Sequence, residues 1–241
     1  MEHAYTNCYL ISDDTGVTLV DAAFPSTARA VLELLAAIGR APADIRALLL
    51  THGHFDHVGF ARGLQRALHV PVWVHVDDQN LAAHPYRYRP ERNRLLYPST
   101  HRRSWPVLGQ MLLAGALSVH GVQADHILRD MEELDVPGQP VVVHTPGHTA
   151  GECAFWLPER RVVLSGDALV TLDPYTGALG PRLVAPAATA DSAQALTSLG
   201  RLADLDADVV LPGHGAAWRK DIRQAVSLAR RATARAAGTE I

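Results

Sequence analysis

Cysteine is scarce in this chain of 241 residues, which contains only Cys8 and Cys153. Secreted domains stabilised by disulfides usually carry several cysteines at short spacings, a pattern that this sequence lacks. We therefore expect a protein that folds without disulfides in a reducing compartment, the cytoplasm. Both cysteines are interpreted as small apolar residues of the core.

Long apolar runs are also missing. The N-terminus has neither the basic start nor the apolar stretch of a secretory signal, and no run reaches the ~18 residues that a membrane-spanning helix needs. The formal net charge of -3 lacks the basic surplus that is typical of nucleic-acid-binding proteins. These absences favour a small-molecule substrate over a membrane or a nucleic acid as the partner.

Lysine is nearly absent, whereas histidine is abundant. Lys220 is the sole lysine among 22 basic residues, and there are 13 histidines. With 48% hydrophobic and 20% charged residues, the composition is that of a folded globular protein and not of a disordered one. The surplus of histidine is therefore the compositional feature that points to a specific chemistry.

Apolar spacing along the chain predicts a succession of strands and helices. The segments TNCYLISD and GVTLVDA alternate apolar and polar residues around the turn DDTG, which predicts an N-terminal β-hairpin. A helix is expected next, over STARAVLELLAAIG, with Ser26 as its N-cap and Gly39 as its stop. Further helices are predicted at 58–68, 77–83, 191–205 and 219–237, and further strands in the segments ALLL, VPVWVHV, HILR, EELDV, PVVVHT, ECAFWLP, RRVVLSGD and DVVLPGHG.

Both halves of the chain combine strands with helices, and no Gly/Ser-rich linker separates them. This organisation predicts one α/β domain over residues 1–241, built of two packed sheets with helices outside. Three of the strands run into a turn with a Gly-His pair, at positions 53–54, 147–148 and 213–214. Because loops at strand ends are where such folds place their sites, these three turns are expected to converge.

The segment THGHFDHVG places four metal-binding side chains, His52, His54, Asp56 and His57, within six positions. In an extended or turn segment His52 and His54 point the same way, as two ligands of one ion must, while Asp56 and His57 lie within reach of a second ion. Imidazole and carboxylate ligands suit zinc, and also iron or manganese. Such a dense string indicates a metal site far more specifically than most short motifs do.

Two metals need more ligands than this cluster supplies, and the sequence offers three more. His148 in HTPGHTAG, Asp167 in VLSGDAL and His214 in LPGHG each follow a strand and adjoin a glycine. Asp167 has two carboxylate oxygens and so can bridge two cations, which a histidine cannot do. The seven side chains together predict a site for two divalent ions, most favourably zinc. His144, two residues before Pro146, is interpreted as a strand residue bonded locally, with a supporting role beside the site as the alternative. His75, at the end of a strand, is interpreted as structural, with a place within reach of the site as the alternative.

The motifs HGHFDH, TPGHT, SGD and PGHG, in this order and spacing, resemble those of the metallo-β-lactamase superfamily over residues 5–216. The resemblance implies an αββα sandwich, in which two mixed β-sheets are flanked by helices. It also implies a supporting role near the site for Asp21, in VDAAFP. The implied ligand sets are His52, His54 and His148 for one ion and Asp56, His57 and His214 for the other, with Asp167 bridging them.

The chemistry implied by this resemblance is hydrolysis. A hydroxide bridging the two ions would attack the carbonyl of an ester, lactone, thioester or amide, with Asp56 as the catalytic residue that orients it and shuttles its proton. The short stretch after His214 is more similar to lactonases than to glyoxalase II-like thioesterases, which carry a longer C-terminal extension. The alternatives are a diiron-type oxidoreductase or a sulfur dioxygenase of the same superfamily, or a metal-holding protein without turnover.

Residues 84–120 interrupt the regular order of elements as a basic, lid-like insertion, with six arginines and one glutamate in 84–103. One interpretation is a lid or pocket wall that attracts an anionic or aromatic substrate group. The other is a solvated loop followed by a helix over 104–118, which packs on the body or forms a homodimer contact. The expected substrate contacts are Arg87, Arg89, Trp105 and, beyond the insertion, Tyr175.

Overall fold

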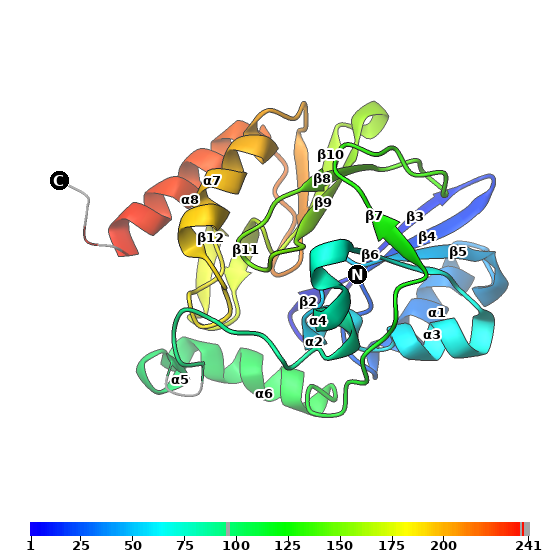
Figure 1. Ribbon diagram of the computed structural model, residues 1–241, viewed down its shortest axis with the longest axis horizontal. Helices are drawn as coiled ribbons and strands as arrows, with labels where there is room; N and C mark the ends of the chain where they lie inside the picture. The colour runs from blue at the N-terminus through cyan, green and yellow to red at the C-terminus, as the bar shows by residue number, and fades with distance from the viewer. Residues whose placement is uncertain (95–96, 237, 239–241) are drawn as a thin grey trace.

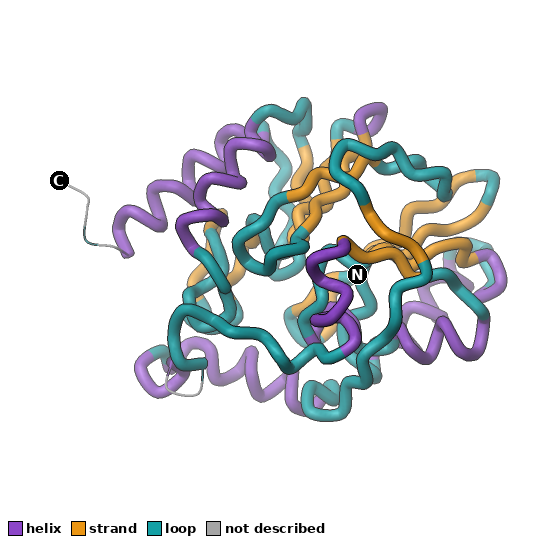
Figure 2. Tube along the Cα trace, in the orientation of Figure 1, coloured by secondary structure: helices purple, strands orange, loops and turns teal. Residues whose placement is uncertain are grey.

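Two mixed β-sheets face each other in the middle of the molecule, and helices cover their outer sides, which confirms the predicted αββα sandwich (Figures 1 and 2). The computed structural model describes residues 1–94, 97–236 and 238. In the first sheet, β3 pairs antiparallel with β4, and the other neighbours pair parallel. Its strands, in spatial order, are β3 (Tyr9–Asp13), β4 (Gly16–Val20), β5 (Ile45–Leu49), β6 (Val72–His75) and β7 (His126–Leu128).

The second sheet is also mixed, because β13 pairs parallel with β10 while β10, β9 and β8 pair antiparallel. Its strands, in spatial order, are β13 (Val209–Pro212), β10 (Val162–Gly166), β9 (Cys153–Leu157) and β8 (Val141–His144). Two short pairs stand apart: β1 (Glu2–His3) with β2 (Thr6–Asn7), and β11 (Val170–Asp173) with β12 (Ala178–Arg182). Sequence patterning does not predict the last pair, because β12 reads ALGPR and so contains two poor strand formers.

Helices α1 and α3 lie against the first sheet, and α7 and α8 lie against the second (Figure 1). Among the helices of the described residues, none is long and apolar enough to cross a lipid bilayer. The α-helices are α1 (Thr27–Ala37), α2 (Phe55–Val58), α3 (Ala61–Leu68), α4 (Gln79–Ala83), α5 (Tyr97–Thr100), α6 (Trp105–Leu113), α7 (Ser192–Ala203) and α8 (Ile222–Ala236). The short 3-10 helices are η1 (Pro42–Asp44), η2 (Val76–Asp78), η3 (Arg102–Ser104) and η4 (Pro158–Arg160).

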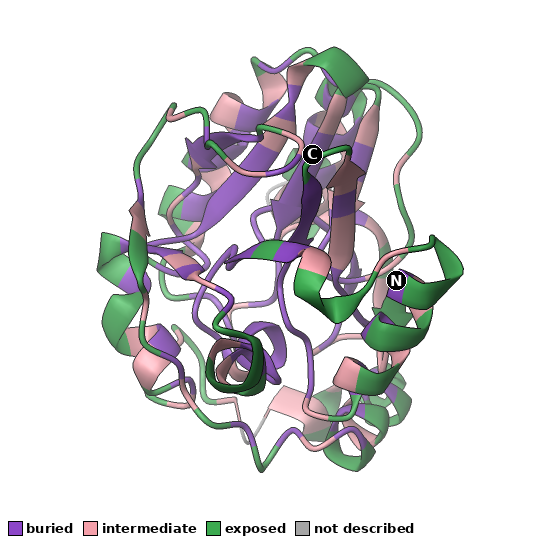
Figure 3. Cartoon of the chain, turned by 90° about the vertical axis from the view of Figure 1, so that its right-hand side faces the viewer, coloured by how far each residue is buried: buried purple, intermediate pink, exposed green. Residues whose placement is uncertain are grey.

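Alternation along the strands divides the core into three apolar layers. Leu48 of β5 packs toward α1 and α3, whereas its neighbour Leu49 points to the other face of the sheet and packs with Phe155 and Leu164 between the two sheets. A third layer joins the second sheet to α7 and α8. Figure 3 shows the strands buried at the centre and the exposed residues on the outside. The sheets are thus fixed against each other, so the loops at their ends have defined positions.

The predicted helix over 58–68 is wrong at its start, because the chain forms two helices separated by Gly59 and Phe60. The Gly59 amide donates to the Ala23 carbonyl at 2.9 Å, and the Phe60 amide donates to the carbonyl of residue 22 at 3.2 Å. A Cβ on Gly59 would lie 2.0 Å from the Ala23 carbonyl oxygen. The close approach of this loop therefore ends α2, which carries two of the predicted ligands.

Two other local predictions are corrected by the hydrogen bonds that the chain makes. The segment EELDV is not a strand: Glu133 forms one isolated bridge to Val141, after a left-handed turn at Met131. Ser26 does precede α1, but its hydroxyl donates to the Ala114 carbonyl at 2.9 Å instead of capping the helix. The Ser26 hydroxyl, which the local sequence assigns to the helix cap, thus bonds to a distant backbone carbonyl instead.

The helix predicted over 104–118 is shorter than expected. α6 ends at Leu113, and Gly115 then adopts a left-handed conformation with φ of 99°. Leu113 and Leu117 are 87% and 81% exposed, and the homodimer contact expected for this segment stays a prediction. The predicted helix end at residue 237, and residues 95–96 of the insertion, lie outside the described residues.

Substituting the glycine that follows α2 and the glycine inside α3 should have opposite effects on stability. Gly59→Ala places a methyl group against backbone atoms, so we expect a loss of about 1–3 kcal/mol. Gly63→Ala adds a methyl group in open space on a helix and should gain about 0.5–1 kcal/mol. Urea unfolding of both variants measures the difference. An unchanged midpoint in Gly59→Ala would show that α2 can continue into α3.

Candidate metal centre

The seven predicted ligands come together at one end of the two sheets. Loops after β5, β8, β10 and β13 supply them, and α2 supplies two of them. Each is at most 7% exposed. Within this set, three groups of three have ligand atoms that lie within 4.8 Å of one another. The first is His52, His54 and His148, the second is Asp56, His57 and His214, and a further group of His52, His57 and Asp167 links them.

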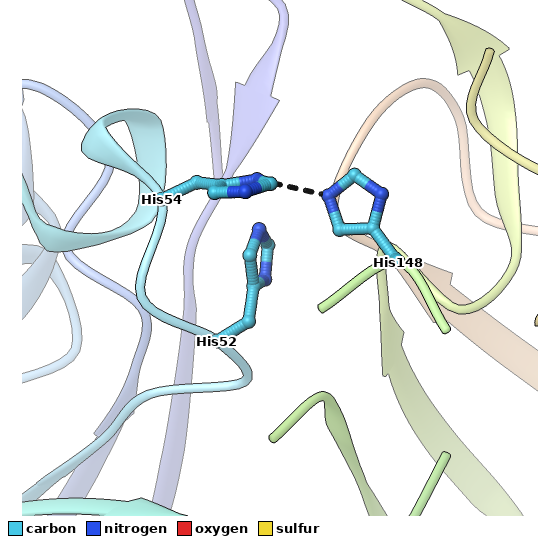
Figure 4. Close-up of side chains that lie close together, drawn as sticks. All are labelled: His52, His54 and His148. Atoms are coloured by element: carbon cyan, nitrogen blue, oxygen red, sulfur yellow. Dashed lines mark hydrogen bonds between the residues drawn. The ribbon is translucent and has the colours of Figure 1, made fainter. Parts of the chain in front are cut away.

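His52, His54 and His148 direct their ring nitrogens toward one another across the gap between the sheets (Figure 4). Nδ1 of His54 lies 3.0 Å from Nε2 of His148. The His52 ring is nearly perpendicular to both, with centroids 4.7 and 4.9 Å away. Three imidazoles from two loops therefore share one centre, and none of their rings stacks face to face on another.

Asp167 lies between the two groups. Its Oδ2 atom is 3.4 Å from Nε2 of His148 in the first group and 3.3 Å from Nε2 of His214 in the second. Its Oδ1 atom is 3.6 Å from Nε2 of His57. One carboxylate is thus in contact with both groups, which is the position that the predicted bridging role requires.

The polar atoms at this centre lack the partners that buried groups normally have. Nε2 of four histidines (His52, His54, His57 and His214) and Oδ1 of Asp167 are buried without a hydrogen bond. Buried polar atoms in proteins are nearly always hydrogen-bonded, so five such atoms in one cluster need an explanation. Nitrogen and carboxylate donors of this kind fit divalent cations, because each lone pair would be satisfied by coordination.

Hydrogen bonds from outside the centre hold two of the histidine rings. Nδ1 of His57 lies 2.8 Å from Oδ2 of Asp21, and Nδ1 of His214 donates to the Tyr5 carbonyl at 2.7 Å. Asp21 also accepts the backbone amide of Thr51 at 2.8 Å, and its backbone has a left-handed φ of 60°. Such contacts fix the Nδ1 proton and leave Nε2 free to coordinate. The structure places Asp21 where its predicted supporting role requires.

Sequence reasoning missed two acidic residues that support the centre. Glu152 is fully buried, with Oε1 accepting the Asp167 amide at 3.0 Å and Oε2 at 3.2 Å from Nδ1 of His52. Asp78 accepts the amides of Gly53 and Gly151, each at 2.8 Å, and so joins the loops that carry the first ligand group. The only signal for these two residues in the sequence is an acidic residue beside an apolar strand, and this signal is weak.

Burial makes the first ligand group neutral. It lowers the pKa of His52 and His54 well below the usual range, helped by the neighbouring histidines, and it lowers the pKa of His148 to about 4. Neutral imidazole is the form that binds a metal. The first group therefore needs no loss of a proton before coordination near neutral pH.

Carboxylates dominate the second group. Burial opposes charge on His57, but Asp21 and Asp167 raise its pKa to about 9, and Asp167 and Asp56 likewise raise the pKa of His214 against the effect of burial. Burial also opposes ionisation of Asp167, yet His214 and His57 lower its pKa. Without a metal these histidines balance the negative charge, a role that a dication would take over.

A cavity of about 20 Å³ adjoins the ligands, and Tyr88 and Tyr175 lie in its wall. Their hydroxyl oxygens are 3.2 Å apart, and the Tyr88 ring lies 4.1 Å from the His54 ring between centroids. Of the expected substrate contacts, Tyr175 is therefore at the site. The structure does not bring the other three into this wall: Arg87 and Arg89 lie outside it, and Trp105 is 54% exposed with its Nε1 donating to a backbone carbonyl.

The chain belongs to the metallo-beta-lactamase superfamily, whose family model matches residues 3–214. A relative with a curated name, the probable metallo-hydrolase YflN of Bacillus subtilis strain 168, is 27% identical over 220 residues. That alignment covers 87% of this chain and 80% of the relative. The family resemblance inferred from the four motifs is thereby confirmed.

Solved structures of the same fold support this assignment. The metallo-beta-lactamase family protein TTHA1429 of Thermus thermophilus is 32% identical, with a TM-score of 0.67 over 95% of this chain and 75% of that one. The protein TTHA1623, solved in a di-iron-bound form, is 30% identical, with a TM-score of 0.57 over 89% of each chain. The metallo-beta-lactamase MIM-2, at 20% identity and a TM-score of 0.69 over 98% of this chain and 85% of that one, shares the fold.

Gly213→Ala should disrupt the centre without removing a ligand. A Cβ at Gly213 would lie 2.2 Å from Oδ1 of Asp167 and 2.9 Å from Cε1 of His57, so both side chains must shift. We expect less than about half of the wild-type metal content at unchanged secondary structure, because ligand distances tolerate only ~0.2 Å. Elemental analysis measures the metal content, and circular dichroism measures the secondary structure. Gly63→Ala is the control. Equal metal content in the two variants would show that a methyl group at position 213 does not displace Asp167 and His57.

Asp21→Asn should weaken the second ligand group selectively. Asparagine keeps the size of the side chain and tolerates the left-handed backbone, but it removes the charge that orients His57. We expect the affinity for one of two metal ions to fall about 10–100-fold, while the other ion binds as before. Competition with a chromophoric chelator measures both constants. Two unchanged constants would remove Asp21 from the support of the centre.

Proposed function

We propose that this protein is a hydrolase that uses two divalent metal ions to cleave an ester, lactone, thioester or amide. The observation that carries the proposal is the contact of the Asp167 carboxylate with histidine rings of both ligand groups. The seven side chains would hold two such ions, which when bound would supply Lewis-acid activation of water and of a carbonyl oxygen. Membership of the superfamily and the name of the relative YflN support the same reaction class.

Asp56 would orient the attacking water and accept its proton. The residue borders the small cavity, and its Oδ2 atom lies 3.3 Å from Nε2 of His214. Burial opposes its charge, but the neighbouring His214 and His57 lower its pKa, so the carboxylate is ionised at neutral pH. The cavity of about 20 Å³ has room for about one water molecule, which matches the need for a single nucleophile.

Tyr175 would act as a hydrogen-bond donor to the substrate. Burial and the neighbouring Tyr88 raise its pKa well above the usual range, so its hydroxyl keeps its proton. A protonated hydroxyl at the wall of the cavity can donate to a carbonyl oxygen as negative charge develops on it. Tyr88 holds the Tyr175 hydroxyl in place until a substrate replaces it.

The insertion over 84–120 would act as a lid. Ligand pockets usually have volumes of about 300–1,000 Å³, so a substrate cannot enter the closed cavity. Leu108 and Met111 of α6 and Tyr88 line it from this insertion, and their displacement would open the site. The lid would thus separate a closed state that excludes water from an open state that admits substrate.

A larger cavity beside the metal site supports an anionic substrate group. It measures about 780 Å³, shares Val184 with the small cavity, and is lined by Arg92, Arg102, Arg103 and Arg182 among others. Its acidic residues are engaged, since Glu91 accepts from Ser192 and Asp173 accepts from Thr176. The insertion would therefore contact substrate through Arg92, Arg102 and Arg103 instead of the expected Arg87 and Arg89.

Zinc and iron are both candidate metals, and iron carries the second candidate function. Zinc suits the imidazole-rich set and agrees with hydrolysis. The di-iron form of the similar protein TTHA1623 favours iron as the alternative. Iron in this centre would be compatible with an oxidoreductase or dioxygenase reaction.

Metal analysis joined to a substrate panel tests the proposal. Protein expressed with added zinc or iron is assayed with lactone, ester, thioester, amide and phosphodiester substrates, and with an oxygen electrode. We expect two metals per chain and hydrolysis of a carbonyl substrate. Asp167→Ala should lose metal and at least about 100-fold in kcat/KM, while Asp14→Ala, in an exposed turn, should keep both. Oxygen consumption without hydrolysis, or full activity in Asp167→Ala, would overturn it.

A further inference from the structure

A second cluster of possible metal ligands lies outside the centre described above. It consists of His75 at the end of β6, Asp77 in η2 and His144 at the end of β8. Each offers one ligand atom, and these atoms lie within 4.8 Å of one another. Because β6 and β8 belong to different sheets, the cluster spans the seam between the two halves of the sandwich.

The two imidazoles of this cluster stack face to face, with centroids 4.0 Å apart and planes at 11°. Two imidazolium ions at this distance would repel each other, so the stack favours neutral rings. Burial and the neighbouring His144 lower the pKa of His75, against the opposing charges of Asp77 and Asp130. Nδ1 of His75 accepts the Asp77 backbone amide at 3.3 Å, so the lone pair of the neutral ring is on Nδ1, and an ion bound there would take the place of this contact.

The hydrogen bonds of His144 leave it in the form that binds a metal. Its Nε2 atom lies 2.9 Å from the Ala150 carbonyl oxygen, which can only accept, so Nε2 must carry the proton. The lone pair is therefore on Nδ1. Metal-ligating histidines commonly donate their other ring nitrogen to a carbonyl in this way.

Asp77 completes the cluster from the solvent side. Its side chain is 55% exposed, and its Oδ2 atom lies 3.6 Å from Nδ1 of His75. The next residue, Asp78, turns inward and accepts hydrogen bonds from Gly53 and Thr149 of the ligand loops. A cation can thus reach the cluster directly from water, without passing through the closed cavity.

We propose that His75, Asp77 and His144 form a third metal site, open to solvent and specific for dications that prefer imidazole, such as zinc, copper or nickel. Ligands of one such ion lie ~3 Å from one another, because metal–nitrogen distances are about 2.0–2.1 Å. The exposed Asp77 side chain can close the remaining gap by rotating. Two imidazoles and one carboxylate disfavour magnesium and calcium, and water completes the coordination. The bound ion would join β6 to β8 beside Asp78.

Equilibrium dialysis with zinc tests this site in the full-length protein. Wild-type protein should bind one more zinc ion per chain than His144→Ala or Asp77→Asn. His126→Ala is the matched control, because His126 is an exposed histidine that stacks on the Trp73 ring in the neighbouring strand and has no place in a described ligand cluster. It should bind as many zinc ions as wild type. The readout is a difference between variants, so it does not depend on how fully the main centre is loaded.

A second measurement keeps the proposal testable if a variant folds poorly. Nitrogen-15 spectra of the histidine side chains in wild-type protein should show that the His75 and His144 resonances shift on addition of zinc. The shift should accompany the one additional zinc ion that His144→Ala does not bind. Magnesium at the same concentration should leave them unchanged. Equal zinc binding in wild type, His144→Ala and Asp77→Asn, or unshifted resonances, would show that the stacked histidines only pack against each other and would overturn the proposal.

Discussion

The burial of the Asp167 carboxylate among histidine rings is the interaction on which the rest of the site depends. A buried charge is costly unless opposite charges or polar groups surround it, and His57, His148 and His214 together surround the Asp167 carboxylate. These rings come from three different segments of the chain. The two sheets must therefore align their strand ends to within hydrogen-bond distances, and the apolar layer between them provides that alignment.

Most of the other unusual features of the chain serve this alignment. Asp21 keeps a left-handed backbone and thereby contacts both Thr51 and His57. Gly59 admits the loop that ends α2, and Gly213 leaves room for the Asp167 oxygen. At each of these positions a tertiary contact overrides the conformational preference of the local sequence. This is the pattern expected where function determines the conformation.

The sequence identified the seven side chains that gather at this centre better than their surroundings, for a physical reason. Metal ligation requires particular residue types next to turns. The short motifs around His52, His148 and His214 could therefore be recognised from the local sequence alone. Glu152 and Asp78 act through contacts between segments distant along the chain, and a single buried acid carries little local signal. The same limit explains the wrong helix start at residue 58, because the group that stops the helix is the carbonyl of Ala23.

The division between the packed sheets and the insertion also explains why only Tyr175 of the four expected substrate contacts lies at the small cavity. The ligands follow strands of two packed sheets, whereas the wall of the cavity comes from Tyr88, α6 and the turn that carries Tyr175. Such segments can change in sequence without moving a ligand, because they share few core contacts with the sheets. Sheet packing thus positions the side chains around Asp167, while the insertion, in the role proposed for it, would control which molecule reaches them.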